Sequence, residues 1–287
     1  MTSTALPVSW RQDVADEWHA ALAIARKELR IAKRYPLNLA NEVLQPLYQF
    51  LLPSLLLGAT FAVGGRALGL ASLTGTDDLA GFLFLGVVVG GLVGAAFWEI
   101  AFSFKREMDT GTLEPAWLTP TRPETFVIGR AIGAMVIAAA TSLVLIGVGS
   151  AVFGATYSAG IVAALPAIVL ASLGMLGIGY LIASAVLMLR EPNFFVDATS
   201  FLFAMASGVA FPITVLPLVV RPVAYLLPTT YALDLLRQYA LGTRPLLDSR
   251  IEWLALTALT LVTLLVGQRV FLRTEHRIRI RGTLGQH

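Results

Sequence analysis

The sequence has no cysteine and few charged residues. Without cysteine, disulfide bonds, thiolate metal sites and a cysteine nucleophile are all excluded. Charged residues make up 14% of the chain and hydrophobic residues 56%, whereas about 25% charged residues is usual in a soluble domain. A water-soluble fold could not bury that much apolar surface. The composition therefore predicts that the bilayer is the solvent for most of this chain.

Histidine and lysine are also scarce, and their positions exclude two kinds of chemistry. The three histidines, His19, His276 and His287, lie in terminal segments outside the apolar runs, and no HExxH or GxSxG motif is present. An ATP-hydrolysing loop needs a glycine-rich phosphate cradle followed by lysine. None of the lysines follows a glycine: Lys27, Lys33 and Lys105. We therefore expect no catalytic residue, metal site, ATP site or other cofactor in this chain.

Apolar runs long enough to cross about 30 Å of hydrocarbon recur along the sequence. We predict six transmembrane helices in a single domain covering residues 1–287, an all-α integral membrane fold. The expected spans are approximately 43–63, 79–104, 126–153, 161–189, 196–219 and 253–272. Prolines interrupt the apolar pattern after Ala210, which indicates a bent or re-entrant hairpin at the membrane surface before the last span.

Residues 10–35 have the pattern of an amphipathic helix that ends before Pro36. Trp10 and Trp18 lie on its apolar side. Basic residues gather toward its end: Arg26, Lys27, Arg30, Lys33 and Arg34. This combination favours a helix in the plane of the lipid headgroups. The alternative is a helix packed on another protein chain.

The distribution of positive charge predicts the orientation. Of the 21 Lys and Arg residues, 16 fall in the N-terminal segment, the region 105–130, the turn at Arg190 and the C-terminal tail. The positive-inside rule then places both termini in the cytoplasm of a multi-pass protein of the plasma or inner membrane. The basic residues are better explained as topology signals than as a nucleic-acid surface. The remaining five basic residues fall on the side of the membrane opposite the cytoplasm: Arg66, Arg221, Arg237, Arg244 and Arg250.

Few ionisable residues lie in or near the spans, and such residues are costly in lipid. They are Glu42, Glu99, Arg130, Asp197 and Asp234. Glu99 and Arg130 fall near the cytoplasmic ends of their helices, so we consider an intramembrane ion pair or simple snorkelling before a proton relay. The roles of the other three stay open. So few charges disfavour an ion-coupled transporter.

Three glycine pairs have the small-xxx-small spacing that lets helices approach closely. They are Gly86/Gly90, Gly90/Gly94 and Gly129/Gly133. Packing within the chain and a dimer face are both consistent with this spacing.

Two segments resemble the ABC-2 type permease family. The first has Gly-Thr-Leu-Glu after an acidic residue, then Thr-Pro and a basic-Pro step, and its key residues are Arg106, Glu107, Gly111, Thr112, Leu113 and Glu114. The second is similar to the family's proline-rich hairpin, with Phe211, Pro212, Pro217, Pro228 and Tyr231. With the N-terminal helix and six spans, the resemblance extends over essentially the whole chain.

The resemblance implies the membrane subunit of an ATP-driven exporter. Two permease copies, identical or paralogous, would dock on two cytoplasmic ATPase subunits, which would carry the ATP and Mg. Residues 107–114 would form a coupling helix that fits a cleft of the ATPase, and the N-terminal helix would lie against the same partner. A low aromatic content of 9% leans toward a drug-like or lipid cargo rather than a polysaccharide.

Two other classes of protein compete with this interpretation. An ATP-independent secondary transporter or channel-like protein would need functional buried charges and no loop like 107–123. An intramembrane enzyme would need a cluster of polar catalytic residues at one depth, which the spans do not supply.

Overall fold

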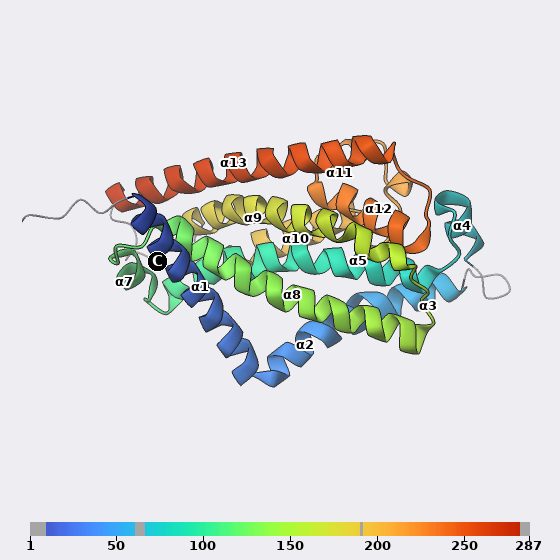
Figure 1. The fold of residues 1–287 in the computed structure, drawn as a ribbon, viewed down its shortest axis with the longest axis horizontal. Coiled ribbons are helices and arrows are strands. Elements are labelled where there is room, and N and C mark those ends of the chain that lie inside the picture. Colours follow the sequence, from blue (N-terminus) through green and yellow to red (C-terminus); the bar gives the residue numbers. More distant parts are fainter. Residues whose placement is uncertain (1–9, 61–66, 190–191, 282–287) are drawn as a thin grey trace, which may run out of the picture.

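The computed structural model describes residues 10–60, 67–189 and 192–281, and within these ranges the chain is helical and contains no strand (Figure 1). Four helical segments in the described part are long and apolar enough to cross a membrane. They are Leu79–Asp109, Pro123–Phe153, Ala159–Met188 and Ser249–Ile278. These four overlap the predicted spans 79–104, 126–153, 161–189 and 253–272. The structure thus describes an all-helical membrane protein, while the count of six spans stays a prediction.

The central helix is Leu79–Asp109, which consists of α5 (Leu79–Gly94), the π-helical turn η2 (Ala95–Ala101) and α6 (Phe102–Asp109). The Asp78 side chain caps its start by accepting from the Gly81 N–H at 2.7 Å. Asp78 also accepts from the Thr156 N–H at 2.9 Å, which ties this start to the loop after α8 (Pro123–Phe153). In that loop, burial and the nearby Asp78 raise the pKa of Tyr157.

Helix α9 (Leu165–Met188), which continues the 3-10 turn η3 (Ala159–Ala164), packs along α13 (Ser249–Arg281). Glycines at the crossing bring the two backbones together. A Cβ on Gly267 would lie 2.1 Å from the Gly177 carbonyl oxygen. Without a large hydrophobic drive between helices in lipid, such close backbone contact is a main source of packing energy.

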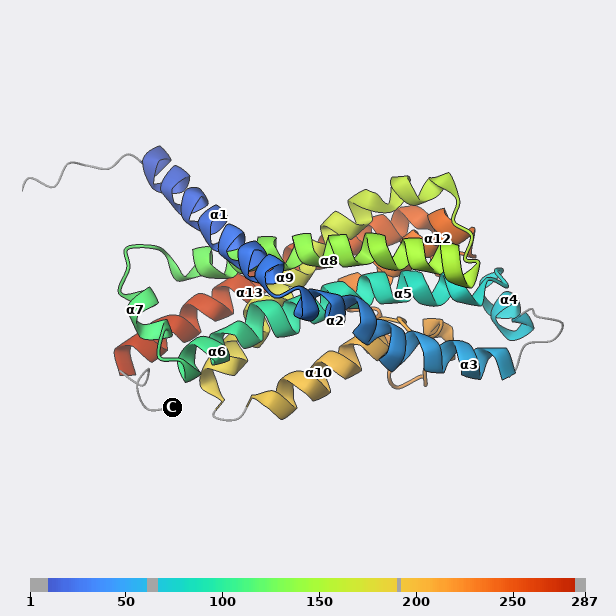
Figure 2. The ribbon, with the colours of Figure 1, turned by 90° about the horizontal axis from the view of Figure 1, so that it is seen from below.

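The N-terminal helix α1 (Trp10–Arg34) slants away from the bundle (Figure 2) and crosses α8. Its small residues Ala21 and Ala25 are buried there, and a Cβ on Gly129 would meet the Ala21 carbonyl oxygen at 2.7 Å. Gly133 faces Glu28 and Ala25 in the same way. The Gly129/Gly133 pair therefore serves packing within the chain.

The first predicted span, 43–63, lies on a bent helical segment. It contains α2 (Pro36–Pro46), the π-helical turn η1 (Leu47–Leu51) and α3 (Leu52–Thr60). Residues 61–63 of that prediction lie outside the described part of the chain. The π turn follows Pro46 directly, as expected where a proline removes a helical donor.

The fifth predicted span, 196–219, is wrong in its extent. Helix α10 (Asn193–Ala206) stops at Ala206, and Gly208 then takes a left-handed φ of 80°. At about 1.5 Å per residue, α10 alone is too short for a bilayer. The apolar chain continues through short helices instead of one span. These are η4 (Ile213–Val215), α11 (Arg221–Ala224) and α12 (Pro228–Leu241).

The bundle has two ends that carry different structures. We call one the α7 end, where α6, α7 (Leu113–Trp117) and the last turns of α13 lie (Figure 1). The other is the α4 end, where α4 (Leu68–Thr74), α11 and α12 lie near the start of α13. The two segments that carry the family resemblance are thus found at opposite ends.

Candidate functional site

The segment expected to couple to an ATPase forms the turn between α6 and α7 at the α7 end. Helix α6 ends at Asp109, and Gly111 takes a left-handed φ of 65°. The Thr112 N–H donates to the Glu107 carbonyl oxygen at 2.9 Å, and the Gly111 N–H donates to the Met108 carbonyl oxygen at 3.1 Å. These bonds close the helix end in the way that a glycine C-cap usually does.

A buried arginine from α8 holds this helix end in place. Arg130, only 3% exposed, donates from Nη1 to Ser103 Oγ at 2.8 Å and forms an ion pair with Glu107. Its guanidinium also lies over the Phe104 ring, 4.8 Å from the centroid. Ser103, Phe104 and Glu107 all belong to α6, so this one side chain locks α6 to α8.

The predicted pairing of Glu99 with Arg130 is wrong. Glu99 instead forms an ion pair with Arg106 at 3.2 Å, while Arg130 pairs with Glu107. The second predicted span ends at residue 104, but the helix continues to Asp109. Glu107 therefore stays on the same helical face as Ser103, four residues earlier, and that face meets α8.

Only part of the expected coupling segment 107–114 is exposed. The Glu107 side chain is mostly covered, and Leu113 is 3% exposed within the main core that contains Phe104. The surface of the turn consists of Thr110, Gly111 and Thr112, and beyond α7 of Leu118, which is 82% exposed. The Glu114 side chain lies outside the described residues. The turn is thus a small exposed tip on a fixed base.

The other residues predicted for the N-terminal helix lie on α1. Trp18 is exposed, as are Arg26, Lys27 and Arg30, while the side chain of Trp10 lies outside the described residues. Glu17 links α1 to the start of α8, where it accepts from the Arg122 N–H at 3.1 Å and from the Thr125 hydroxyl. No sequence pattern indicates this link, because the partners of Glu17 are more than a hundred positions away.

The predicted hairpin residues lie at the α4 end. Phe211 packs beside Ile213, Pro212 lines a cavity, and Pro217 is exposed. Pro228 begins α12, and the Tyr231 hydroxyl donates to the Tyr225 carbonyl oxygen at 2.9 Å. These residues therefore surround an irregular stretch and do not form one cluster.

Sequence reasoning missed the role of Arg237 on α12, which is buried at 5% exposure. It donates to the carbonyl oxygens of Phe82 at 3.0 Å, Gly208 at 2.9 Å and Val209 at 3.1 Å. Its guanidinium lies 3.4 Å from the centroid of the Phe82 ring. The acceptors are backbone atoms, so no side-chain pattern could have indicated them.

Carboxylates also meet at the α4 end. Gln238 Nε2 donates to Asp234 Oδ2 at 2.8 Å and to Glu252 Oε2 at 2.6 Å, which joins α12 to α13. Among the residues that the structure describes, no group of three or more His, Asp or Glu side chains could hold a metal ion.

The long apolar helices and the buried polar contacts between them define a multi-pass helical membrane protein. The family model of the ABC-2 type transporters matches residues 19–241. Since this match covers more than half of the chain, the chain belongs to the ABC-2 type transporter family and is a membrane component of a transporter. No curated protein matches it in sequence.

Proposed function

We propose that this chain is the permease subunit of an ATP-binding-cassette exporter and that separate ATPase subunits act on it through the α6–α7 turn. One observation carries the proposal. The exposed tip of this turn sits at the end of a 31-residue helix, Leu79–Asp109, and Arg130 fixes its base to α8. At about 1.5 Å per residue, this helix is long enough to cross the bilayer.

A rigid base is what such coupling requires. Movement of an ATPase can be transmitted to the membrane-spanning helices only through a rigid contact. The ion pair between Glu107 and Arg130, and the burial of Leu113, join the tip to two membrane helices. A push on the exposed Leu118 or on Thr112 would therefore displace α6 and α8 together.

The topology we propose has six crossings and both termini in the cytoplasm, on the side of the α7 end. The segment from Pro36 to Thr60 would supply the first crossing. Helix α10 with the hairpin that follows it would supply the fifth, because α13 starts at the α4 end (Figure 1). The positive charge at the α7 end supports this orientation.

Two copies of the permease, identical or paralogous, would assemble with two ATPase subunits, which carry the ATP and Mg. The apolar, weakly charged spans favour a hydrophobic or amphipathic cargo. The direction of transport, out of the cytoplasm, rests on the family alone.

The first test is to purify the tagged chain from its native membranes in mild detergent and to identify the copurifying proteins with their stoichiometry. We expect two ATPase subunits for two permease chains. Repeated recovery of the chain alone, also after crosslinking, would contradict the proposal.

The second test addresses the tip itself. We expect Leu118→Ser to lower ATP hydrolysis coupled to transport in the reconstituted complex, with unchanged thermal stability of the permease. Leu218→Ser is the matched control, because Leu218 is also highly exposed but lies in the hairpin. If the two variants have equal ATPase activity in the reconstituted complex, the tip is not part of the coupling contact.

A further inference from the structure

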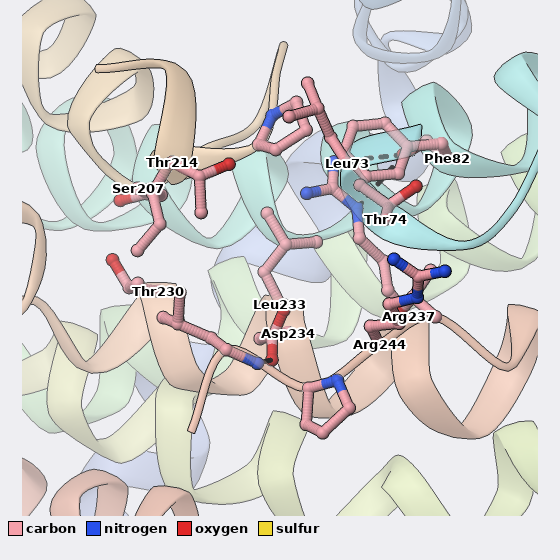
Figure 3. Close-up of a pocket in the computed structure, with 15 residues that line it drawn as sticks. Leu73, Thr74, Phe82, Ser207, Thr214, Thr230, Leu233, Asp234, Arg237 and Arg244 are labelled. Atoms are coloured by element: carbon pink, nitrogen blue, oxygen red, sulfur yellow. Dashed lines mark hydrogen bonds between the residues drawn. The ribbon is translucent and has the colours of Figure 1, made fainter. Parts of the chain in front are cut away.

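A cavity of about 130 Å³ lies at the α4 end, at the opposite end of the bundle from the coupling turn (Figure 1). Figure 3 shows the residues that line it. Segments that are far apart in sequence form its walls. Thr74 of α4 and Phe82 of α5 line one part, and Ser207 and Pro212 line another. Helix α12 and the loop from Thr243 to Leu246 complete it.

The loop after α12 contributes hydrogen-bond donors that have no acceptor in the described protein. The Thr243 hydroxyl is buried and has no hydrogen-bond partner. The backbone N–H of Arg244 donates to the Thr74 carbonyl oxygen at 2.7 Å. The Arg244 side chain makes no hydrogen bond or ion pair with any described residue. Its guanidinium can supply up to five N–H donors.

Arg237 adds a buried positive charge to the same cavity. Its Nη1 atom bears two N–H groups and donates to one protein acceptor, the Gly208 carbonyl oxygen. No carboxylate of the described residues lies within ion-pair distance of it. Asp234, one turn earlier on α12, lies beyond ion-pair distance but offsets its charge in part, together with the backbone carbonyls and the Phe82 ring. A charge that is only partly offset is costly away from water.

The acceptors in the cavity wall are largely engaged. Asp234 Oδ2 already accepts from Gln238 at 2.8 Å and from the Leu246 N–H at 2.9 Å. The hydroxyls of Thr74 and Thr230 donate to backbone carbonyls. Two arginines and one aspartate give the lining residues a net charge of +1. The cavity thus offers donors and positive charge, whose complement is a group that only accepts hydrogen bonds.

We propose that this cavity binds a small oxyanion group, a phosphate or a group with the same acceptor oxygens, either as a free anion or as part of a lipid headgroup. The Arg244 guanidinium holds it, and Arg237 supplies a buried charge at the inner wall. The Thr243 hydroxyl, which solvent does not reach in this structure, turns toward the anion on binding. The volume admits one such group with a few water molecules. The site does not depend on the coupling role of the α6–α7 turn.

The first probe is inorganic phosphate, added to the full chain purified in mild detergent, with chloride at matched ionic strength as the reference. Phosphate raises the thermal unfolding temperature of the wild type. Arg244→Gln raises the phosphate concentration needed by about tenfold, because it removes a charge-assisted contact. Arg250→Gln, at an exposed position of the same region outside the cavity, responds like the wild type.

Thr243→Val separates ligand binding from a purely structural role. The variant keeps the side-chain shape and removes a buried hydroxyl that has no partner. Without an anion, its unfolding temperature is equal to or higher than that of the wild type. With phosphate, its upward shift is smaller than that of the wild type. An equal shift in both proteins contradicts a role of this hydroxyl in binding.

The second probe distinguishes the two sources of the anion. The chain is placed in nanodiscs of phosphatidylglycerol or of phosphatidylcholine. Stabilisation by phosphatidylglycerol that Arg244→Gln weakens and Arg250→Gln preserves assigns the site to a lipid headgroup. A response to inorganic phosphate alone assigns it to a free anion. If the wild type and both arginine variants respond alike to both probes, the proposal is wrong.

Discussion

The two ends of the bundle surround a buried arginine with different partners. Each buries one arginine, Arg130 at the α7 end and Arg237 at the α4 end, with exposures of 3% and 5%. Each guanidinium lies over a phenylalanine ring, that of Phe104 or of Phe82. The partners of the two arginines differ. Arg130 has the Glu107 carboxylate, whereas Arg237 has backbone carbonyls.

The difference follows from the local backbone. At the α7 end two regular helices, α6 and α8, face each other, so only side chains can join them. At the α4 end α10 stops at Ala206, and the carbonyls of Gly208 and Val209 have no following helical turn to donate to them. Arg237 replaces the missing donors. We therefore expect the α7 end to respond to charge removal, and the α4 end to respond to backbone displacement as well.

The largest effect is expected for Arg237→Met, which keeps an apolar side chain but removes every donor. The carbonyls of Gly208 and Val209 then lose their donor away from water. We expect a loss of about 3–5 kcal/mol in unfolding free energy or failure of the protein to accumulate in the membrane. Arg250→Met is the control, because Arg250 is exposed and lies outside the cavity, and it should change stability by about 0.5 kcal/mol or less. Stability is measured by thermal unfolding in detergent.

The next effect is expected for Glu107→Ala, which leaves the buried Arg130 without its carboxylate. We expect a loss of about 2–4 kcal/mol, somewhat less than for a fully buried pair because Glu107 keeps some exposure. The double variant Glu107→Leu with Arg130→Met should recover most of this loss. If the double variant is as unstable as the single one, the charge pair is not what holds α6 to α8.

A smaller effect at the α4 end separates backbone displacement from charge. A Cβ on Gly86 would lie 2.1 Å from the Val209 carbonyl oxygen, one of the acceptors of Arg237. We expect Gly86→Ala to cost about 1–3 kcal/mol by forcing this backbone away. Gly91→Ala on the same helix has open space around the new methyl group and should be neutral or slightly stabilising. If Gly86→Ala and Gly91→Ala have the same unfolding temperature within error, Gly86 does not approach the Val209 backbone as closely as the structure shows.

The sequence predicts the long helices well, since their apolar runs are flanked by clear boundaries. Pro123 begins α8, and Gly154 ends it with a left-handed φ of 70°. The run 196–219 misled the prediction, because its apolar composition does not distinguish a spanning helix from an apolar hairpin. The prolines after Ala210 indicate the hairpin, but α10 stops earlier, at Ala206. The signal of that early stop, Ser207-Gly208, is a local turn signal that periodicity does not weigh.

The candidate site is predicted less completely, because its partners are set by tertiary packing. The sequence singles out Glu107 and Arg130 separately, but their pairing depends on α6 continuing past Lys105. The π-helical turn at Ala95–Ala101 also changes which face Glu99 presents, since an extra residue rotates the helix by about 100°. No sequence pattern marks that turn.

The smallest effect is expected at Glu17. It tests whether a polar side chain attaches α1 to α8, as the Glu107–Arg130 pair attaches α6 to α8. Glu17 accepts from the Arg122 N–H and the Thr125 hydroxyl at the start of α8, where the helix dipole favours a negative charge. Glu17→Gln should cost about 1 kcal/mol or less in global stability. The contact joins a slanting terminal helix to the bundle, so the effect should be local. Amide hydrogen exchange of α1 should increase while that of α9 stays unchanged.

Asp16→Asn removes a neighbouring exposed charge that makes no such contact and serves as the matched control. Equal exchange of α1 in the two variants would show that the close packing of Ala21 and Ala25 on α8, and not the Glu17 contact, attaches this helix to the bundle.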